Sequence, residues 1–459
     1  MAHRSSSCKS LTGPRTFWPL CPVYNSPAAM LDRELIRKQT DLVREGISRK
    51  GLDAGIVDAF ITADSNWRKT LTELETKQAE ANQFSKSIGQ LMAQGKKDEA
   101  EAAKAETRQL KEAIAVLEGE ARTLEESLRA IELDMPNLPH ESVPDGANET
   151  ENVTRRTWGD IPNFTFTPKP HWEIAESLGI VDFPRGAKIS GSGFPVYVGL
   201  GARLQRALIS FLINFQTENN GYQEIYPPYL VNRASLVGTG QLPKFEEDLY
   251  KSTDDLYLIP TAEVPITNLY RDEILDAKEL PINLAGYSAC FRREAGAAGK
   301  DTRGLQRLHQ FDKIEMVKFT TPETSYQELE NMTQNAEDVL KALGLTYRVI
   351  EICTGDIGPK GSKQYDLETW SPVMEKWLEV SSCSNFEAYQ SRRANIRYRP
   401  EPGAKPEFVH ILNGSALGMP RVYATILESY QQEDGSVSVP DVLVPYMGTE
   451  LISKTQDPS

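Results

Sequence analysis

Two stretches between residues 64 and 134 repeat mostly apolar or small residues at alternating spacings of four and three positions. The first set comprises Trp67, Leu71, Leu74, Gln78, Ala81, Ser85 and Ile88, and the second comprises Leu110, Ile114, Leu117, Ala121, Leu124, Leu128 and Ile131. This spacing places one continuous seam along an α-helix and is typical of coiled coils. Because Gly95 lies in the break between the two sets, we predict two antiparallel helices joined by a turn there.

The second predicted helix should end before Pro136 and Pro139, since proline lacks the backbone N–H that a helix interior requires. An acidic linker rich in turn residues follows through Glu151. The cations that gather toward the predicted turn are Lys86, Lys96, Lys97, Lys104 and Arg108. Charge alone favours a solvated helix face for these cations, and contact with nucleic acid is the alternative.

From residue 152 onward, the pattern changes to short strand-like runs that follow one long amphipathic helix. This helix, at 201–220, carries Leu204, Leu208, Leu212 and Phe215 on one face. The clearest strand-like runs lie at 222–231, 256–260, 311–319, 347–352 and 377–382. Strands joined by hairpin-length turns after a helix predict an antiparallel sheet with helices on one side, so the expected fold class is α+β.

The chain therefore divides into an extension at 1–29, a helical domain at 30–135 and a sheet-containing domain at 136–459. Its 459 residues exceed one ordinary core and fit two or three domains. The sheet-containing part has neither a GxxxxGK[ST] loop nor a GxGxxG turn between a strand and a helix. A nucleotide site there would have to use side chains rather than a glycine-rich cradle.

Composition narrows the possible classes of function. The net charge of −14 argues against non-specific coating of nucleic acid, which needs a surplus of Lys and Arg, but it is compatible with a local basic patch. No run of about 18 apolar residues occurs, so we expect no membrane-spanning helix. The five cysteines form no CxxC pair and the five histidines show no metal-ligand spacing, so free thiols in a reducing compartment are expected.

Residues 1–29 contain Arg4, Lys9 and Arg15 but no Asp or Glu, and they are rich in Ser and Pro. An organellar transit peptide has this bias. The favoured alternative is a start at Met30, where a coherent amphipathic pattern begins, because the prolines at 14, 19 and 22 would break the helix of a mitochondrial signal. We therefore expect a cytoplasmic protein, with an organellar location as the alternative.

The segment FRREAGAAGKDTRGLQRLHQFDKIE (291–315) predicts a hairpin that aims an arginine, a carboxylate and an aromatic ring at one face. Arg292 and Glu294 end its first strand, and Phe311 and Glu315 lie on its return strand. An arginine fork can grip a phosphate, a carboxylate can accept from an exocyclic amine, and a phenyl ring can stack on a base. The alternative is a surface hairpin held by ion pairs.

Two further segments of the chain, one before and one after this hairpin, carry motifs of their own. NGSALGMPRVYATILESYQ (413–431) combines a Gly-rich strand, Arg421 and a helix, and residues 201–228 combine a long helix, a strand and Pro228. In this order, the three segments resemble the signature motifs of class II aminoacyl-tRNA synthetases. Ala416 departs from the generic pattern, which has a glycine at that position.

Shorter stretches narrow the resemblance to seryl-tRNA synthetases of the bacterial type. They are TGQLPKF (239–245), PTAEVP (260–265), HQFDKIE (309–315), CTGDIG (353–358), EVSSCSNF (379–386) and NGS (413–415). An N-terminal two-helix arm is a hallmark of that family, and the resemblance covers about residues 30–450. Gly193 is a departure, because the family would lead us to expect an arginine there.

The resemblance implies ATP-dependent attachment of L-serine to tRNA(Ser), and to tRNA(Sec) where the host has it, through a seryl-adenylate. It implies catalytic roles for Arg292, Glu294 and Arg421. Arg292 would bind the ATP α-phosphate and the serine carboxylate, and Arg421 would cover adenine and reach the γ-phosphate. Further contacts with ATP are implied for Arg293, Phe311, Glu379, Val380, Ser381 and Ser382. Glu379 and Ser382 would also ligate Mg²⁺.

The contacts with serine implied by the resemblance are Thr261, Ala262, Glu263, Glu315 and Ser415. Thr261 and Glu263 would meet the serine ammonium, and Glu315 and Ser415 would receive its hydroxyl. The helical arm would bind tRNA, and the helix at 201–220 would form the contact of a homodimer.

Three other classes of protein are alternatives. A ligase that loads an amino acid onto a carrier protein would share the catalytic half, but the paired-helix arm argues against it. A threonine-specific enzyme would be expected to hold zinc, and the scattered Cys and His argue against that. A purely structural coiled-coil protein would explain residues 64–134 and nothing beyond them.

Overall fold

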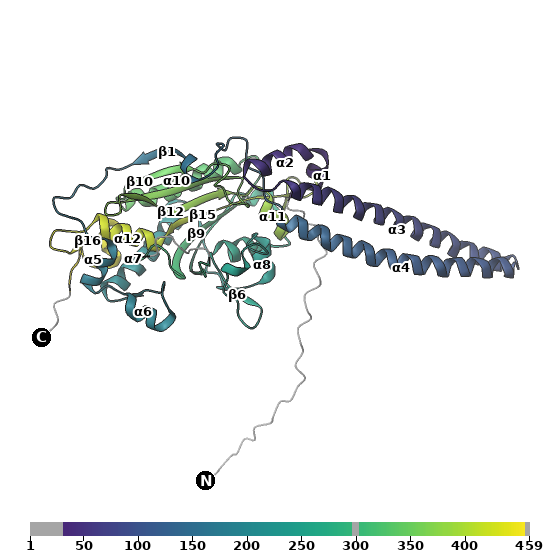
Figure 1. The fold of residues 1–459 in the computed structure, drawn as a ribbon, viewed down its shortest axis with the longest axis horizontal. Coiled ribbons are helices and arrows are strands. Elements are labelled where there is room, and N and C mark those ends of the chain that lie inside the picture. Colours follow the sequence, from purple (N-terminus) through teal and green to yellow (C-terminus); the bar gives the residue numbers. More distant parts are fainter. Residues whose placement is uncertain (1–30, 296–302, 455–459) are drawn as a thin grey trace, which may run out of the picture.

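Two long antiparallel helices project from the rest of the chain (Figure 1). The computed structural model describes residues 31–295 and 303–454. Within them, α3 spans Gly55–Ala93 and α4 spans Lys97–Asp134, and the turn between them contains Gly95. The predicted two-helix coiled coil is therefore confirmed.

The seam of this helix pair is longer than the hydrophobic pattern suggested. Leu74 of α3 and Ala121 and Leu128 of α4 are buried, as predicted. Toward the tip, the seam on α4 continues through the buried residues Ala100, Ala103 and Thr107. Alanine and threonine are weak hydrophobic signals, so the sequence pattern began only at Leu110, whereas their small side chains let the two helices pack closely in space.

A small helical domain, which we call the arm base (residues 31–67 and 124–139), surrounds the root of the two long helices. Helices α1 (Arg33–Lys38) and α2 (Thr40–Arg49) pack there (Figure 1). The apolar core of the arm base contains Leu31, Ile36, Val43, Ile47, Val57, Phe60, Leu128 and Met135. The root of the arm is thus held by a core of its own, whereas the distal part is held by the seam alone.

Buried carboxylates in the arm base are paired with arginines. Arg33 forms an ion pair with Glu132, and Arg37 forms one with Asp64. Both carboxylates are almost fully buried, so loss of either arginine would leave a desolvated charge. These pairs tie α1 to both long helices.

The second half of the chain is built on an eight-stranded sheet with the strand order β1-β10-β11-β12-β15-β9-β8-β4. The strands are β1 (Val153–Trp158), β10 (Tyr347–Glu351), β11 (Lys363–Ser371), β12 (Lys376–Asn385), β15 (His410–Gly418), β9 (Gln310–Thr320), β8 (Ile282–Phe291) and β4 (Gln223–Glu224). Every neighbouring pair is antiparallel except β4 and β8. The predicted antiparallel sheet is confirmed.

The two faces of this sheet differ. On β9, Ile314 and Met316 belong to the large core, to which α7 (Leu200–Asn219), α10 (Ser325–Ala342) and α12 (Met419–Ser429) contribute. On the opposite face of β9, Val317 and Phe319 belong to a second core with the short helices α9 (Glu263–Thr267) and α11 (Tyr389–Ala394). The long helices therefore share one face, and the described helices that border the other face are short.

The linker after α4 is integrated into the second half of the chain rather than free. The backbone N–H of Asn137 donates to the carbonyl of Pro359 at 2.8 Å, and that of Thr354 donates to the carbonyl of Pro144 at 2.9 Å. These bonds attach the linker to the segment that precedes β11.

Two expectations drawn from composition can be compared with the described part of the chain. It contains no helix that is long and apolar enough to cross a membrane. Cys290, Cys353 and Cys383 are buried free thiols. The predicted extension at 1–29 lies outside the described residues.

Candidate active site

A cavity of about 680 Å³ opens on the face of the sheet that carries the short helices. It gathers most of the side chains that the sequence singled out, namely Thr261, Glu263, Arg292, Glu294, Phe311, Glu315, Glu379, Val380, Ser381, Ser382, Ser415 and Arg421. Ala262 and Arg293 do not line it. Ala262 is fully buried in the adjoining core, and the backbone N–H of Arg293 donates to the carbonyl of Asp248. Their contacts with substrates remain predictions.

The β8–β9 hairpin places the predicted cation and aromatic ring together. The guanidinium of Arg292 lies 5.1 Å from the centre of the Phe311 ring, and its Nε donates to the carbonyl of Pro260 at 3.3 Å. Glu294 follows with a left-handed φ of +52°, which is uncommon for a residue with a Cβ. Its carboxylate accepts a bond of 3.0 Å from Arg307, a residue that the sequence interpretation did not name.

Gly193, the departure noted in the sequence, lies beside this hairpin. Its φ is +78°, and its carbonyl accepts from the backbone N–H of His309 at 3.0 Å. A Cβ at this position would lie 2.6 Å from Cδ2 of His309, whose ring also stacks on Phe194. An arginine could therefore not replace Gly193 without displacing His309.

Glu315 lies at the bottom of the cavity and is only 2% exposed. It forms an ion pair with Lys313, and it accepts a bond of 3.0 Å from the hydroxyl of Thr261. Lys313 also donates to that hydroxyl at 2.9 Å, so the three side chains form a closed triangle. Sequence interpretation missed Lys313, although alternation along a strand places residues two apart on the same face.

Ser415 stands directly opposite Glu315 in the pairing of β15 with β9. Side chains at paired positions of neighbouring strands share one face, so both can reach the same small group. The hydroxyl of Ser381, on β12, donates to the carbonyl of Ser415 at 2.5 Å. This bond joins β12 to β15 beside the cavity.

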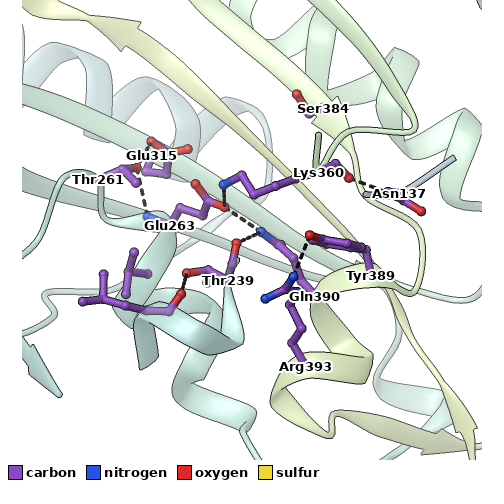
Figure 2. Close-up of polar contacts among 12 residues, drawn as sticks. Asn137, Thr239, Thr261, Glu263, Glu315, Lys360, Ser384, Tyr389, Gln390 and Arg393 are labelled. Carbon is purple, nitrogen blue, oxygen red and sulfur yellow. Dashed lines mark hydrogen bonds and ion pairs between the residues drawn. The ribbon is translucent and has the colours of Figure 1, made fainter. Parts of the chain in front are cut away.

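Glu263 begins α9 and is 6% exposed. Its Oε1 atom accepts from Lys360 at 3.2 Å and from Gln390 at 2.6 Å (Figure 2). Neither donor was named from the sequence. Lys360 belongs to an irregular loop and Gln390 to the short helix α11, so no local pattern marks them.

A third group of polar side chains lies at β12. The guanidinium of Arg421 donates to the carbonyl of Glu379 at 2.6 Å and lies 3.5 Å from its carboxylate. Asp366 pairs with Ser382 across β11 and β12. Burial, with the nearby Glu379 carboxylate, raises the pKa of Asp366 well above its usual value.

These oxygen donors suit a hard divalent cation. Mg²⁺ is usually held by one or two carboxylates together with the phosphates of its nucleotide, rather than by a cage of protein ligands. Glu379 and Ser382 line the cavity and match that modest set. In the described ranges, no cluster of three or more His, Cys, Asp or Glu could hold a metal by itself.

Comparison with known proteins gives consistent similarities along the chain. The model of the seryl-tRNA synthetase N-terminal domain matches residues 30–139, and that of the class II tRNA synthetase core domain (G, H, P, S and T) matches residues 244–430. A serine–tRNA ligase of Carboxydothermus hydrogenoformans is 53% identical over 426 residues, which cover 93% of this chain and all of that relative.

Solved structures show the same similarity. The seryl-tRNA synthetase of Pyrococcus horikoshii, complexed with ATP, has a TM-score of 0.87 and 38% identity, and the match covers 93% of this chain and 100% of that one. The cytoplasmic serine–tRNA ligase of Naegleria fowleri, in complex with AMP, has a TM-score of 0.81 and 32% identity, with coverage of 94% and 99%.

We predict that Glu315→Gln lowers the free energy of unfolding by about 3–5 kcal/mol, because it leaves the buried Lys313 without its carboxylate. Urea unfolding at neutral pH measures this change. The double variant Glu315→Gln/Lys313→Met removes both charges and should recover most of the loss. If the single variant is as stable as the parent, the pair is not desolvated as described.

Proposed function

Since this chain belongs to the seryl-tRNA synthetase family of class II aminoacyl-tRNA synthetases, we propose that the cavity is where serine and ATP react. The chain is a serine–tRNA ligase, which attaches L-serine to tRNA(Ser) with ATP through a seryl-adenylate. One observation supports the assignment most strongly: a single cavity collects the Arg292–Phe311 pair, the Glu315 triangle and Glu263.

ATP occupies the part of the cavity between the β8–β9 hairpin and α12. Phe311 and Glu294 receive adenine, and Arg421 covers its other face and reaches the γ-phosphate. Arg292 binds the α-phosphate and the serine carboxylate, since its guanidinium can use several N–H donors at once. The Naegleria fowleri and Pyrococcus horikoshii proteins, crystallised with AMP and ATP, support a nucleotide in the corresponding cavity.

Glu379 and Ser382 hold Mg²⁺, which when bound offsets the negative charge of the phosphates. Asp366 lies beside them and adds a further negative charge when ionised. Arg421 lies 3.5 Å from the Glu379 carboxylate and keeps it oriented until the nucleotide arrives. Glu379 and Ser382 lie on β12 and Asp366 lies on the neighbouring strand β11, so the sheet fixes the spacing of the three side chains.

The reaction needs placement rather than a covalent nucleophile. The serine carboxylate attacks the α-phosphorus in line and pyrophosphate leaves, while Arg292 and Arg421 stabilise the developing charge. A hydroxyl of the terminal adenosine of tRNA then attacks the carbonyl of the adenylate, and AMP leaves. Alignment of two bound reactants can supply an effective molarity on the order of 10⁵ M or more.

Serine is recognised by its ammonium and by its hydroxyl. Glu263 and Thr261 receive the ammonium, and Glu315 and Ser415 receive the hydroxyl. Thr261 and Lys313 both contact Oε2 of Glu315, and alanine would offer no hydroxyl to the other oxygen of this carboxylate. Threonine keeps the hydroxyl and only adds a methyl group, so alanine should be rejected more strongly than threonine. Lys313 already pairs with Glu315, and this limits the electrostatic cost of the empty site.

The arm binds tRNA, and the protein acts as a homodimer in the cytoplasm. The exposed cations near the tip support tRNA binding by the arm, although Lys96 and Lys104 form ion pairs with Glu99 and Glu101.

The long helix α7 forms the dimer contact, in keeping with two-fold assemblies being the commonest. Sedimentation at micromolar concentration should give about twice the 51.3 kDa of one chain, and a monomer alone would contradict the dimer.

The distal arm should be dispensable for activation and required for transfer. Gln78 of α3 contacts Glu118 of α4 at 3.4 Å, so replacing residues 79–117 with a short Gly/Ser turn preserves the register. Because the arm base keeps its own core, we expect serine-dependent exchange of pyrophosphate into ATP to remain largely intact. Charging of tRNA(Ser) should be lost. A truncated protein that charges tRNA as well as the full chain would exclude the arm as the tRNA contact.

Glu315 should determine the choice between serine and alanine. We expect Glu315→Gln to lower kcat/KM for serine activation by about 100-fold or more, because a neutral amide grips the hydroxyl weakly. The alanine-to-serine ratio of kcat/KM should rise. Glu263→Gln is the matched control, since the ammonium is common to both amino acids and the ratio should stay constant. Equal slowing of serine and alanine in Glu315→Gln would mean that the hydroxyl is recognised elsewhere.

A further inference from the structure

The wall of the cavity beside Glu263 is held from outside by the arm base. Residues 358–361 form this wall and lie in neither a helix nor a strand, so their backbone groups depend on external partners. Their one long side chain is that of Lys360, whose Nζ contacts Glu263 (Figure 2). The outward side of the segment meets Lys50 and Asn137.

All four carbonyls of residues 358–361 accept a hydrogen bond from the arm base. Lys50 Nζ donates to the carbonyls of Gly358 at 3.1 Å and Gly361 at 2.6 Å. Asn137 donates through its backbone N–H to the carbonyl of Pro359 at 2.8 Å, and through Nδ2 to the carbonyl of Lys360 at 3.0 Å. Two residues of the arm base therefore define the path of the whole segment.

The hydrogen bonds from Lys50 and Asn137 to residues 358–361 lie in a buried interface, so breaking one of them is unfavourable. Lys50 is 4% exposed and Asn137 is 3% exposed. Burial, with a smaller contribution from the nearby Lys244, lowers the pKa of Lys50 to about 7. The amine keeps at least two N–H donors in either protonation state, as many as the two carbonyls need. An unpaired carbonyl left in such a place costs about 1–3 kcal/mol, so the segment is strongly constrained.

The second donor to Glu263 is also tied to the arm base. Gln390 lies on α11, and one turn later Arg393 donates from its guanidinium to the carbonyl of Leu133, in the last turn of α4, at 2.7 Å. The same guanidinium group donates to the hydroxyl of Tyr389 at 2.7 Å. Figure 2 shows Lys360 and Gln390 both reaching Glu263, with Asn137 bonded to Lys360 and Arg393 bonded to Tyr389.

Both donors to Glu263 bind the same oxygen, Oε1. Among the described residues, no hydrogen bond to Oε2 is found, which leaves this oxygen for a ligand. A carboxylate held at one oxygen is restricted in rotation and presents the other in a defined direction. Displacement of Lys360 would weaken that restriction, because Gln390 alone of these two donors would then hold Oε1.

We propose that Lys360 is a positioning residue for serine, and that the arm base, through Lys50 and Asn137, sets the affinity for serine before any tRNA is bound. The proposal rests on the proposed role of Glu263 as the acceptor of the serine ammonium. It makes the arm base part of the amino-acid site, whereas the distal arm remains separate from it.

The test is serine-dependent exchange of pyrophosphate into ATP, measured with the full chain and without tRNA. The variants are Lys50→Met, Asn137→Ala and Lys360→Ala. We expect each to raise the KM for serine by about tenfold, a typical size for coupling between linked sites, and to leave the KM for ATP within about twofold. Lys360→Gln keeps a donor to Glu263 and should recover much of the loss.

Arg49→Met is the matched control. Arg49 precedes Lys50 and binds Asp145 at 2.8 Å at the same junction, but it makes no bond to residues 358–361. It should leave both KM values unchanged. The dissociation constant of serine, measured by calorimetry in the absence of ATP, should follow the KM for serine in all variants.

Two outcomes would overturn the proposal in distinguishable ways. If Glu263→Gln raises the KM for serine but the Lys50, Asn137 and Lys360 variants do not, the coupling is wrong and the role of Glu263 stands. If Glu263→Gln itself leaves that KM unchanged, the role of Glu263 fails and the proposal fails with it. Lys360 lines the cavity and is partly exposed, so Lys360→Ala remains decisive even if a buried variant does not fold.

Discussion

The antiparallel register of β9 between β8 and β15 is the constraint on which the site depends. Because side chains alternate along a strand, this register puts Phe311, Lys313 and Glu315 on the cavity face and Ile314 and Met316 in the core. A slip of one residue would exchange the two sets. Such a slip would remove Ile314 and Met316 from the large core under α7, α10 and α12. The packing of this face of the sheet therefore determines which side chains of β9 line the cavity on the other face.

Each of three carboxylates in the site, two of them buried, has a basic partner. Glu294 pairs with Arg307, Glu315 with Lys313, and Glu263 with Lys360. An unpaired buried carboxylate would tend to take up a proton, and would then lose its strength as an acceptor. The basic partners orient the carboxylates before substrates bind. A reaction that depends on placement rather than on a covalent nucleophile requires this preorganisation.

The helical arm has a distal portion and a base, and different contacts hold each of them. Its distal portion projects from the rest of the chain and is held by a seam of small and apolar side chains between α3 and α4 (Figure 1). Its base has a core, two buried ion pairs and hydrogen bonds to the wall of the cavity. The base is therefore connected to the catalytic half by specific contacts, whereas the distal portion projects from it.

The sequence by itself determined the elements that rest on local periodicity and on ordered motifs. The four-and-three spacing predicted the coiled coil, the strand-like runs predicted the antiparallel sheet, and the motifs identified most of the cavity lining. The small residues of the seam, Ala100 and Ala103, were missed because they carry little hydrophobic signal, and Lys313 was missed although alternation pointed to it.

Only the tertiary structure decided how Lys50, Asn137 and Lys360 come together. Lys50 and Gly361 are 311 positions apart, and no periodicity or motif connects them. Their contact depends on where α2 docks against an irregular loop, and that docking is set by the shared burial of several elements. Local patterns report which face of an element is buried, whereas the identity of the element that covers it is a property of the whole fold.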